Sequence, residues 1–295
     1  MLRRVGDRYL ISSELSYFGH VALVTGEAGR AEALFAEGLA AARELGAPQM
    51  IAPFHWHLGN VAFWQGDMGR AAALYEEGVA RSRERQDTIW IARNLAGLGR
   101  VAQRQGDTAR AAALLQESLS LCTAMEHTLG VAVALHGLGL VAQARGDGRQ
   151  AIALLRQSLV LCQQLSERLA IVECLESLAL VLAEGQPQQA ARLLGAATGL
   201  RAGMGAPLPL SARETYDRLL ADLRARLGEA TFLAAWDTGQ GFSLDQAIAE
   251  ALASTDPPPP AVAEDAVVHR PTTLPLCPPE QNAASRYHDQ GEFRE

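Results

Sequence analysis

Apolar and small residues recur along the chain at the spacing of helix faces. A two-residue turn recurs every 40 residues, at Gly26-Glu27, Gly66-Asp67, Gly106-Asp107 and Gly146-Asp147, with Gln186-Pro187 at the fifth position. After each turn, apolar or small residues stand at i, i+3, i+4, i+7, i+8 and i+11, which is one face of an α-helix. A fixed period of roughly 20–50 residues is typical of a solenoid, in which each unit buries its apolar face against its neighbours.

A second helical pattern precedes each turn. Ile51, Leu58, Val61 and Ala62 of one unit match residues exactly one period later in the next unit. A glycine follows the Leu or Phe of this pattern, at Gly19, Gly59, Gly99 and Gly139. Glycine inside a helix is unfavourable by about 0.5–1 kcal/mol relative to Ala, so its recurrence predicts a close helix crossing. The acidic residues Asp67, Asp107 and Asp147 are predicted to cap the helices that follow them.

Three features of each unit resemble the tetratricopeptide repeat. They are Leu-Gly, an Ala 12 residues after that Gly, and an aromatic residue or Leu four residues further on, as in Leu58-Gly59, Ala71 and Tyr75. The units depart from the family by running 40 residues instead of about 34 and by lacking its Pro at the unit end. The resemblance implies an all-α fold, a right-handed solenoid of helix pairs.

Residues 190–252 resemble the closing segment of a group of large bacterial regulators. Those proteins join a signal-transducing NTPase, tetratricopeptide-like repeats and often a LuxR-type DNA-binding domain. The similar stretches are ARLLGAA from Ala191, the segment from Phe232 to Trp236, and LDQAI from Leu244. The resemblance implies the repeat portion of such a regulator, acting on an NTPase or DNA-binding effector domain in cis or in trans. We expect this portion to stand alone, because Leu10 already lies in the first repeat helix and no recognition-helix pattern follows residue 253.

Three segments are predicted along the chain. Residues 1–205 form the repeat solenoid, residues 206–253 form short capping helices, and residues 254–295 form a disordered tail that holds most of the 13 Pro. Within the second segment, Ser211 with Glu214 predicts a capping box, and Ser243 predicts a second capped helix.

Composition and motifs exclude several classes of function. The net charge of −7 argues against a general affinity for nucleic acid, and the absence of Lys removes Schiff-base and Walker-type phosphate sites. No signal peptide and no apolar run of about 18 residues is present, so we expect a soluble, cytoplasmic protein that does not bind a membrane. We find no catalytic motif and expect no enzyme activity, no cofactor and no metal. Cys122 and Cys162, one period apart, are predicted core residues.

The predicted functional surface is the concave groove. His55 and His57 cannot share a metal ion, because residues i and i+2 face different sides of a helix, and His55 is predicted to be a core histidine with a hydrogen-bond partner. In tetratricopeptide repeats the first helix of each unit builds the concave face. The family positions carried over to this chain give the candidate groove residues His20, Trp56, Asn60, Phe63, Trp64, Arg93, Arg100, Arg104, His136, Gln143, Glu173 and Glu176.

The sequence leaves three interpretations of this groove open. The first is a sensor in which a protein, a peptide or a small inducer binds the aromatic and Arg residues and changes the solenoid's curvature or its docking to the effector domain. The second is a scaffold that binds partners and transmits nothing. The third is nucleic-acid binding through Arg93, Arg100 and Arg104, which the net charge disfavours. The competing structural interpretation is that Phe63 and Trp64 only pack between helices and that the Arg side chains are solvated.

Overall fold

The described part of the chain folds into α-helices and contains no strand. The structure is a computed structural model that describes the backbone of residues 2–253 and the side chains of residues 13–253, so the tail predicted at 254–295 lies outside the described residues. The described residues belong to one compact unit, Met1–Ala253. The helices are α1 (Leu2–Val24), α2 (Ala28–Glu44), the short 3-10 helix η1 (Pro48–Met50), α3 (Ile51–Gln65), α4 (Met68–Glu84), α5 (Thr88–Arg104), α6 (Thr108–Ala124), α7 (Thr128–Ala144), α8 (Gly148–Gln164), α9 (Arg168–Leu182), α10 (Pro187–Met204), α11 (Leu210–Leu227), α12 (Glu229–Gln240) and α13 (Leu244–Leu252).

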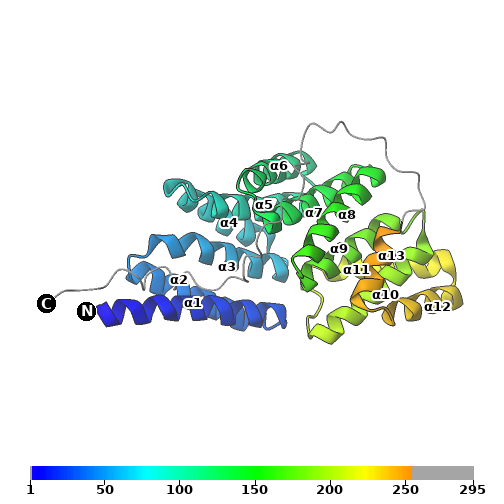
Figure 1. Cartoon of the computed structure of the whole chain (residues 1–295), viewed down its shortest axis with the longest axis horizontal. Coiled ribbons are helices and arrows are strands. Elements are labelled where there is room, and N and C mark those ends of the chain that lie inside the picture. The colour runs from blue at the N-terminus through cyan, green and yellow to red at the C-terminus, as the bar shows by residue number, and fades with distance from the viewer. Residues whose placement is uncertain (1, 254–295) are drawn as a thin grey trace. The chain divides into compact units, whose positions relative to one another are not determined.

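Helices α1 to α10 form five successive pairs. Each pair packs its two helices against each other, and its second helix packs on the first helix of the next pair (Figure 1). This arrangement confirms the predicted all-α solenoid of helix pairs. None of the described helices is both long enough and apolar enough to cross a membrane.

Two sets of left-handed turns keep the 40-residue period. The predicted glycine turns have φ of 84° at Gly26, 87° at Gly66, 82° at Gly106 and 80° at Gly146, which glycine adopts without a steric penalty. The other turn of each unit is also left-handed, with φ of 61° at Gly46, 55° at Gln86, 55° at Glu126 and 58° at Ser166. The sequence did not reveal this second set, because three of its four members carry side chains.

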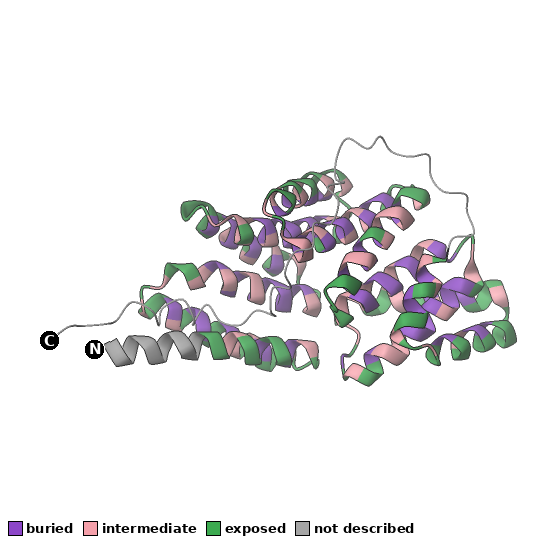
Figure 2. Cartoon of the chain, in the orientation of Figure 1, coloured by how far each residue is buried: buried purple, intermediate pink, exposed green. Residues whose placement is uncertain are grey.

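Close helix crossings occur where the glycines inside the first helices predicted them. A methyl group on Gly59 would lie 2.6 Å from Cε1 of Tyr75, so only glycine leaves room for the ring. The same contact recurs as Gly19 with Phe35, Gly99 with Leu115 and Gly139 with Leu155. The larger partners of these glycines are fully buried, and the buried residues of successive helices face one another (Figure 2).

The acidic residues before the second helices cap them as predicted. Asp67, Asp107 and Asp147 accept a hydrogen bond from the backbone N–H three residues later, at 3.0, 3.0 and 2.9 Å. Two further caps were not predicted. Asp87 and His127 accept from the backbone N–H groups of Trp90 and Gly130 at the start of first helices. By contrast, Glu27 makes no side-chain cap bond to α2.

Three small predictions about the core have different outcomes. Cys122 and Cys162 are each 2% exposed, which confirms them as core residues. His55 is 3% exposed, as predicted, but its Nδ1 atom has no hydrogen-bond partner among the described residues. The expected partner of this histidine nitrogen is therefore not observed.

Helices α12 and α13 cover the last repeat. Gly239 of α12 lies so close to α10 that an added methyl group would overlap the carbonyl group of Arg192. Helix α13 packs on α8, α9 and α10. Its last carbonyl groups are bound from the repeats, because the Arg156 guanidinium of α8 donates to the oxygens of Ala251 and Ala253 at 2.9 and 2.7 Å. The predicted cap of α13 is present at Ser243, and it forms a full capping box in which Ser243 and Gln246 each bond the other's backbone N–H.

Helix α11 departs from its predicted start and its predicted surroundings. It begins at Leu210 after the extended residue Pro209 and has no side-chain cap bond, so the predicted Ser211–Glu214 capping box is wrong. The helix packs on α10 and α12 and also reaches back to α3. The loop before it places the Pro207 ring against Gly26, in the first repeat turn. The division between a 1–205 solenoid and 206–253 capping helices falls in this loop and stays a proposal.

Candidate functional site

The candidate site is a cavity of about 360 Å³ between the first helices of the repeats and α11. Four consecutive first helices contribute to its wall, namely α3, α5, α7 and α9, and the end of α10 and the start of α11 complete it. The cavity thus joins residues that are far apart along the chain.

The cavity brings together most of the predicted groove residues. They are Phe63 and Trp64 of α3, Arg100 and Arg104 of α5, His136 and Gln143 of α7, and Glu173 and Glu176 of α9. All eight positions came from the tetratricopeptide pattern, and three pairs are equivalent in different units, namely Phe63 with Gln143, Trp64 with Arg104, and His136 with Glu176. The longer units therefore do not change which side of each first helix faces inward.

The other four predicted residues do not line this cavity. His20 is exposed on α1. Asn60 is 8% exposed, and its side-chain oxygen accepts a hydrogen bond from the Tyr75 hydroxyl at 2.8 Å. Asn60 is thereby a buried partner of the core and not an open groove residue.

Trp56 and Arg93, the remaining two, form a separate cluster with Trp90. We call these three residues the Trp56 cluster. The two indole rings meet edge to face with centroids 5.9 Å apart. The Arg93 guanidinium lies 4.8 Å from the Trp90 ring centroid and 5.6 Å from that of Trp56, as in a cation–π contact. The sequence did not single out Trp90, which comes from the first turn of α5.

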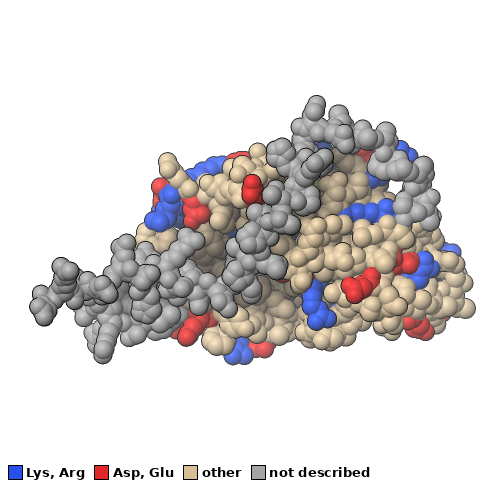
Figure 3. Space-filling model, viewed as in Figure 1, with Lys and Arg blue, Asp and Glu red and all other residues tan. Residues whose placement is uncertain are grey.

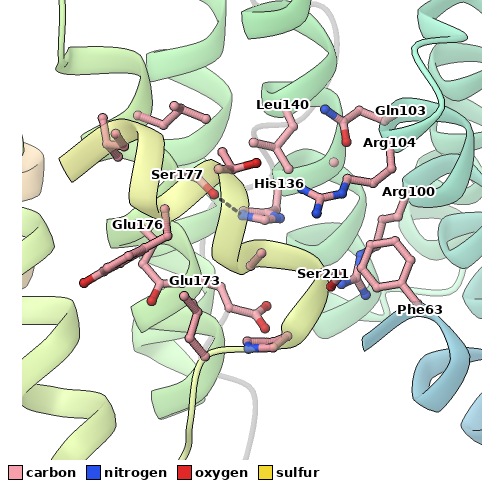
Figure 4. Close-up of a pocket in the computed structure, with 18 of the residues that line it drawn as sticks. Phe63, Arg100, Gln103, Arg104, His136, Leu140, Glu173, Glu176, Ser177 and Ser211 are labelled. Carbon is pink, nitrogen blue, oxygen red and sulfur yellow. Dashed lines mark hydrogen bonds between the residues drawn. The ribbon is translucent and has the colours of Figure 1, made fainter. Parts of the chain in front are cut away.

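The cationic side of the cavity comes from α5. Arg104 extends from this helix toward His136, and Arg100 lies beside Phe63 (Figure 4). The Arg100 guanidinium lies over the Phe63 ring, 4.3 Å from its centroid. Burial, and then the neighbouring Arg100, lower the pKa of Arg104. Neither arginine forms a hydrogen bond or an ion pair with the residues that the structure describes.

The opposite side carries two carboxylates of α9. Glu176 accepts two hydrogen bonds from Arg201 of α10, from Nε at 2.6 Å and from Nη2 at 2.9 Å. Burial raises the pKa of Glu176, and the Arg201 hydrogen bonds oppose this shift. The third guanidinium nitrogen of Arg201, Nη1, is buried and has no partner among the described residues. Glu173 lines the cavity next to this pair.

A serine and a histidine meet in the cavity wall. His136 Nε2 and Ser177 Oγ are 2.8 Å apart, and burial lowers the pKa of His136, so the imidazole is neutral near pH 7. The same inter-repeat hydrogen bond joins Ser16 and His57 at 2.9 Å, with the two residue types exchanged. Because the pair recurs far from the cavity, it is a joint between repeats and not a nucleophile with its base.

The wall from α11 was not predicted. Ser211, Ala212, Thr215, Tyr216 and Leu219 face the cavity from one side of this helix. The Tyr216 hydroxyl is 2.5 Å from Thr198 Oγ1, which ties α11 to α10. The spacing of Ser211, Thr215 and Leu219 by four residues was the available signal, but nothing in it pointed to the repeats.

The chemistry of the cavity suits binding. Its polar groups are guanidiniums, hydroxyls, amides and two carboxylates, which recognise charged and hydrogen-bonding groups of a ligand. No set of three or more His, Cys, Asp or Glu among residues 13–253 could hold a metal ion. On the face shown in Figure 3, acidic and basic side chains are scattered and form no broad basic surface.

Comparisons with known proteins place the repeats. The family model described as tetratricopeptide repeat matches residues 49–124 and 130–201. No curated protein matches the chain. The crystal structure of BtubC (BKLC) from P. vanneervenii is similar with a TM-score of 0.50 and 21% identity, over 70% of this chain and 90% of that one. A putative kinesin light chain from Podosopora anserina with nearly identical TPR-like repeats matches with a TM-score of 0.44 and 20% identity, over 65% of this chain and 95% of that one.

Proposed function

Because the chain belongs to the tetratricopeptide repeat family, we propose that it is the sensor portion of a bacterial transcriptional or signal-transduction regulator. Repeats of this family are in general non-enzymatic scaffolds that bind protein partners. The finer role has two supports. One is the resemblance of residues 190–252 to the closing segment of LuxR-type regulators, and the other is the cavity.

The observation that carries the proposal is the convergence of inner-face positions on one cavity. Eight candidates chosen from the repeat pattern line it, together with a helix from outside the repeats. Such a cavity gives the protein a place where an occupant touches the repeats and α11 together. An occupant that binds better when α11 is docked on α3 favours that state, and it thereby alters the surface offered to an effector domain.

The groove also offers a surface for a partner segment. The Trp56 cluster presents two aromatic rings and a guanidinium on neighbouring first helices. Trp and Arg are the residues that most often dominate binding energy at protein interfaces. We assign partner capture to this cluster and to Trp64.

Partner capture tests the proposal. The tagged full chain is purified from its own cells as wild type, as the Trp56→Ala/Trp64→Ala double variant, and as Leu233→Ala. Leu233 lies on α12 and is 42% exposed, so it is a matched control for loss of exposed apolar surface. We expect a stoichiometric partner with the wild type and the control, and a loss of about tenfold or more with the double variant.

Circular dichroism shows whether the double variant keeps its helices. If the double variant loses its helices, Arg93→Gln replaces it in the experiment. This substitution changes only the charged member of the Trp56 cluster. Equal capture by all variants would contradict the groove assignment. The scaffold alternative predicts capture that no small ligand alters. The nucleic-acid alternative gains no support, because the net charge is −7 and Arg93 lies over aromatic rings of the chain itself, outside the cavity that Arg100 and Arg104 line.

A further inference from the structure

Arg100 and Arg104 place two positive charges on successive turns of α5. Like charges at i and i+4 of a helix repel each other, and no carboxylate among the described residues forms an ion pair with either one. The guanidinium carbon of Arg100 lies 4.3 Å from the Phe63 ring centroid, and this contact uses none of the N–H groups as hydrogen-bond donors to an oxygen. The pair therefore has hydrogen-bond donors that the described residues do not use, although Glu214 acts on the charge of Arg104 from a distance.

A third guanidinium in the same wall has an unused donor. The Arg201 side chain is 8% exposed, and Glu176 occupies its Nε and Nη2 groups. Its Nη1 group is buried without a partner among the described residues. Buried polar groups in proteins nearly always have a hydrogen-bond partner, so this donor is an exception among the described residues.

The size and the remaining walls fit a small molecule. A volume of about 360 Å³ lies in the range of small-ligand pockets, about 300–1,000 Å³. Hydroxyl donors come from Ser211 and Thr215 of α11, and apolar wall comes from Leu140 and Leu180. An occupant with an anionic head and a partly apolar body satisfies both kinds of wall.

We infer that the cavity binds a small organic anion whose carboxylate or phosphate group is held by Arg100 and Arg104. The inference rests on the proposed function in that it names the ligand class of the same cavity. Hydroxyl groups of Ser211 and Thr215 donate to the bound anion. The ligand thus connects α5 with α11, and it slows the opening of α11 from the repeats.

Thermal unfolding of the full chain tests this inference with two simple probes, sodium phosphate and sodium acetate, each against sodium chloride at equal ionic strength. The Arg100→Gln/Arg104→Gln variant is compared with the wild type and with Arg85→Gln/Arg149→Gln. Arg85 and Arg149 are exposed and lie outside the cavity, so the control changes the net charge equally. We expect at least one probe to raise the midpoint of the wild type and of the control by about 2–4 °C more than that of the cavity variant.

The comparison between variants removes a general salt effect. Phosphate stabilises folded proteins by exclusion from their surface, and this acts on all three proteins alike. A shift with phosphate alone assigns the site to phosphate esters, and a shift with acetate alone assigns it to carboxylic acids. An equal shift of the midpoint in the three proteins, with phosphate and with acetate, would overturn the inference.

Hydrogen exchange gives a second readout that does not depend on the arginine variants. The effective probe should slow amide exchange in α11 of the wild type, and Ser211→Ala/Thr215→Ala should remove this protection. Unchanged exchange in α11 would refute the link between the anion and this helix. Partner capture separates the two proposals. If partner capture depends on the tryptophans but neither anion shifts the unfolding midpoint, only the anion site is refuted. If an anion shifts the midpoint but capture does not depend on the tryptophans, only the partner surface is refuted.

Discussion

A half-buried histidine, His57, shows how one residue joins two repeats. His57 lies on the Phe35 ring, with centroids 4.5 Å apart and planes within 12° of parallel, and it shares a hydrogen bond with Ser16. Burial, and then the nearby His20 and Arg93, lower the pKa of His57 to about 3. The folded protein therefore favours the neutral imidazole of His57.

His57 predicts that stability falls in mild acid. The pKa of the folded form lies below that of the unfolded chain, so the unfolded chain takes up the proton first as the pH falls below about 6.5. Stability from this group is complete above that value and is lost toward pH 3. Between about pH 7 and about pH 5 we expect His57 to account for a loss of up to about 2 kcal/mol in the free energy of unfolding.

Urea denaturation at the two pH values measures this loss. His57→Phe keeps the stacked ring and removes the titration, so its stability should fall less than that of the wild type. His136 remains in both proteins and contributes in the same direction, because burial lowers its pKa as well. An identical pH dependence in the two proteins would show that His57 is not the group responsible.

At the residue scale, the sequence predicted which side chains face inward better than it predicted their hydrogen-bond partners. The repeat register placed Phe63, Arg100 and Glu173 on the inner side, and all three line the cavity. It also gave Asn60 to the groove, but that side chain bonds the Tyr75 hydroxyl of the next helix. A hydrogen bond of this kind depends on the rotamers of two residues on different helices, which periodicity does not encode.

At the scale of the element, some acidic residues before the second helices accept a hydrogen bond from the helix backbone, and others occupy the same position without one. Asp107 accepts from the Arg110 backbone at 3.0 Å, whereas Glu27, at the equivalent position, has no cap bond. Removing a bonding cap costs about 1 kcal/mol. Asp107→Ala should lower the free energy of unfolding by about this amount.

Glu27→Ala is the matched control for this prediction. It removes the exposed ion pair with Arg30 and a long hydrogen bond from the Thr25 hydroxyl at 3.4 Å. Exposed contacts of this kind are worth at most about 1 kcal/mol and often less. Chemical denaturation of both variants checks the ranking. An equal or larger loss in Glu27→Ala would contradict the distinction between the two caps.

The presence of each repeat helix was predictable, because the same pattern of apolar positions recurs in every unit. The boundaries at Gly66, Gly106 and Gly146 follow from residues that favour φ > 0. The start of α11 was mispredicted, because Ser211 with Glu214 has the composition of a capping box while Pro209 already leads into the helix. Local sequence offered two compatible starts, and the packing of α11 on its neighbours was not visible in it.

At the scale of the whole molecule, one buried ion pair joins the two helices of the last repeat, α9 and α10, beside the cavity. Arg201 and Glu176 have side chains that are 8% and 17% exposed. Breaking such a pair from one side leaves a buried charge without its partner, at about 3–5 kcal/mol. We expect Arg201→Met to lower the free energy of unfolding by about 3 kcal/mol, the low end of this range, because Glu176 keeps some contact with water.

The double variant Glu176→Leu/Arg201→Met tests the reason for that loss. Replacing both charges with apolar side chains removes the unpaired carboxylate, so much of the stability should return. Denaturant titration of the single and double variants measures the coupling between the two sites. A double variant that is less stable than Arg201→Met would show that the pair itself, and not the orphaned charge, supplies the stability.

Contacts between distant parts of the chain were the part of the fold that the sequence could not provide. A repeat pattern specifies how each unit meets its neighbours. It says nothing of α11, which lies outside the repeats and packs on α3. The cavity is formed by the first helices of the repeats together with α11, so the sequence predicted the wall from the first helices and missed the wall from α11.

The contact of α11 with α3, and of Pro207 with Gly26, changes how the repeats can come apart. A stack held only by neighbouring units frays from its ends, one unit after another. Here α11 packs on the second repeat and Pro207 packs on the first, so fraying at one end must also break contacts at the other end. A ligand or partner that pulls α11 away would therefore do more than open a cavity. It would turn an all-or-none unit into a set of repeats that melt in succession.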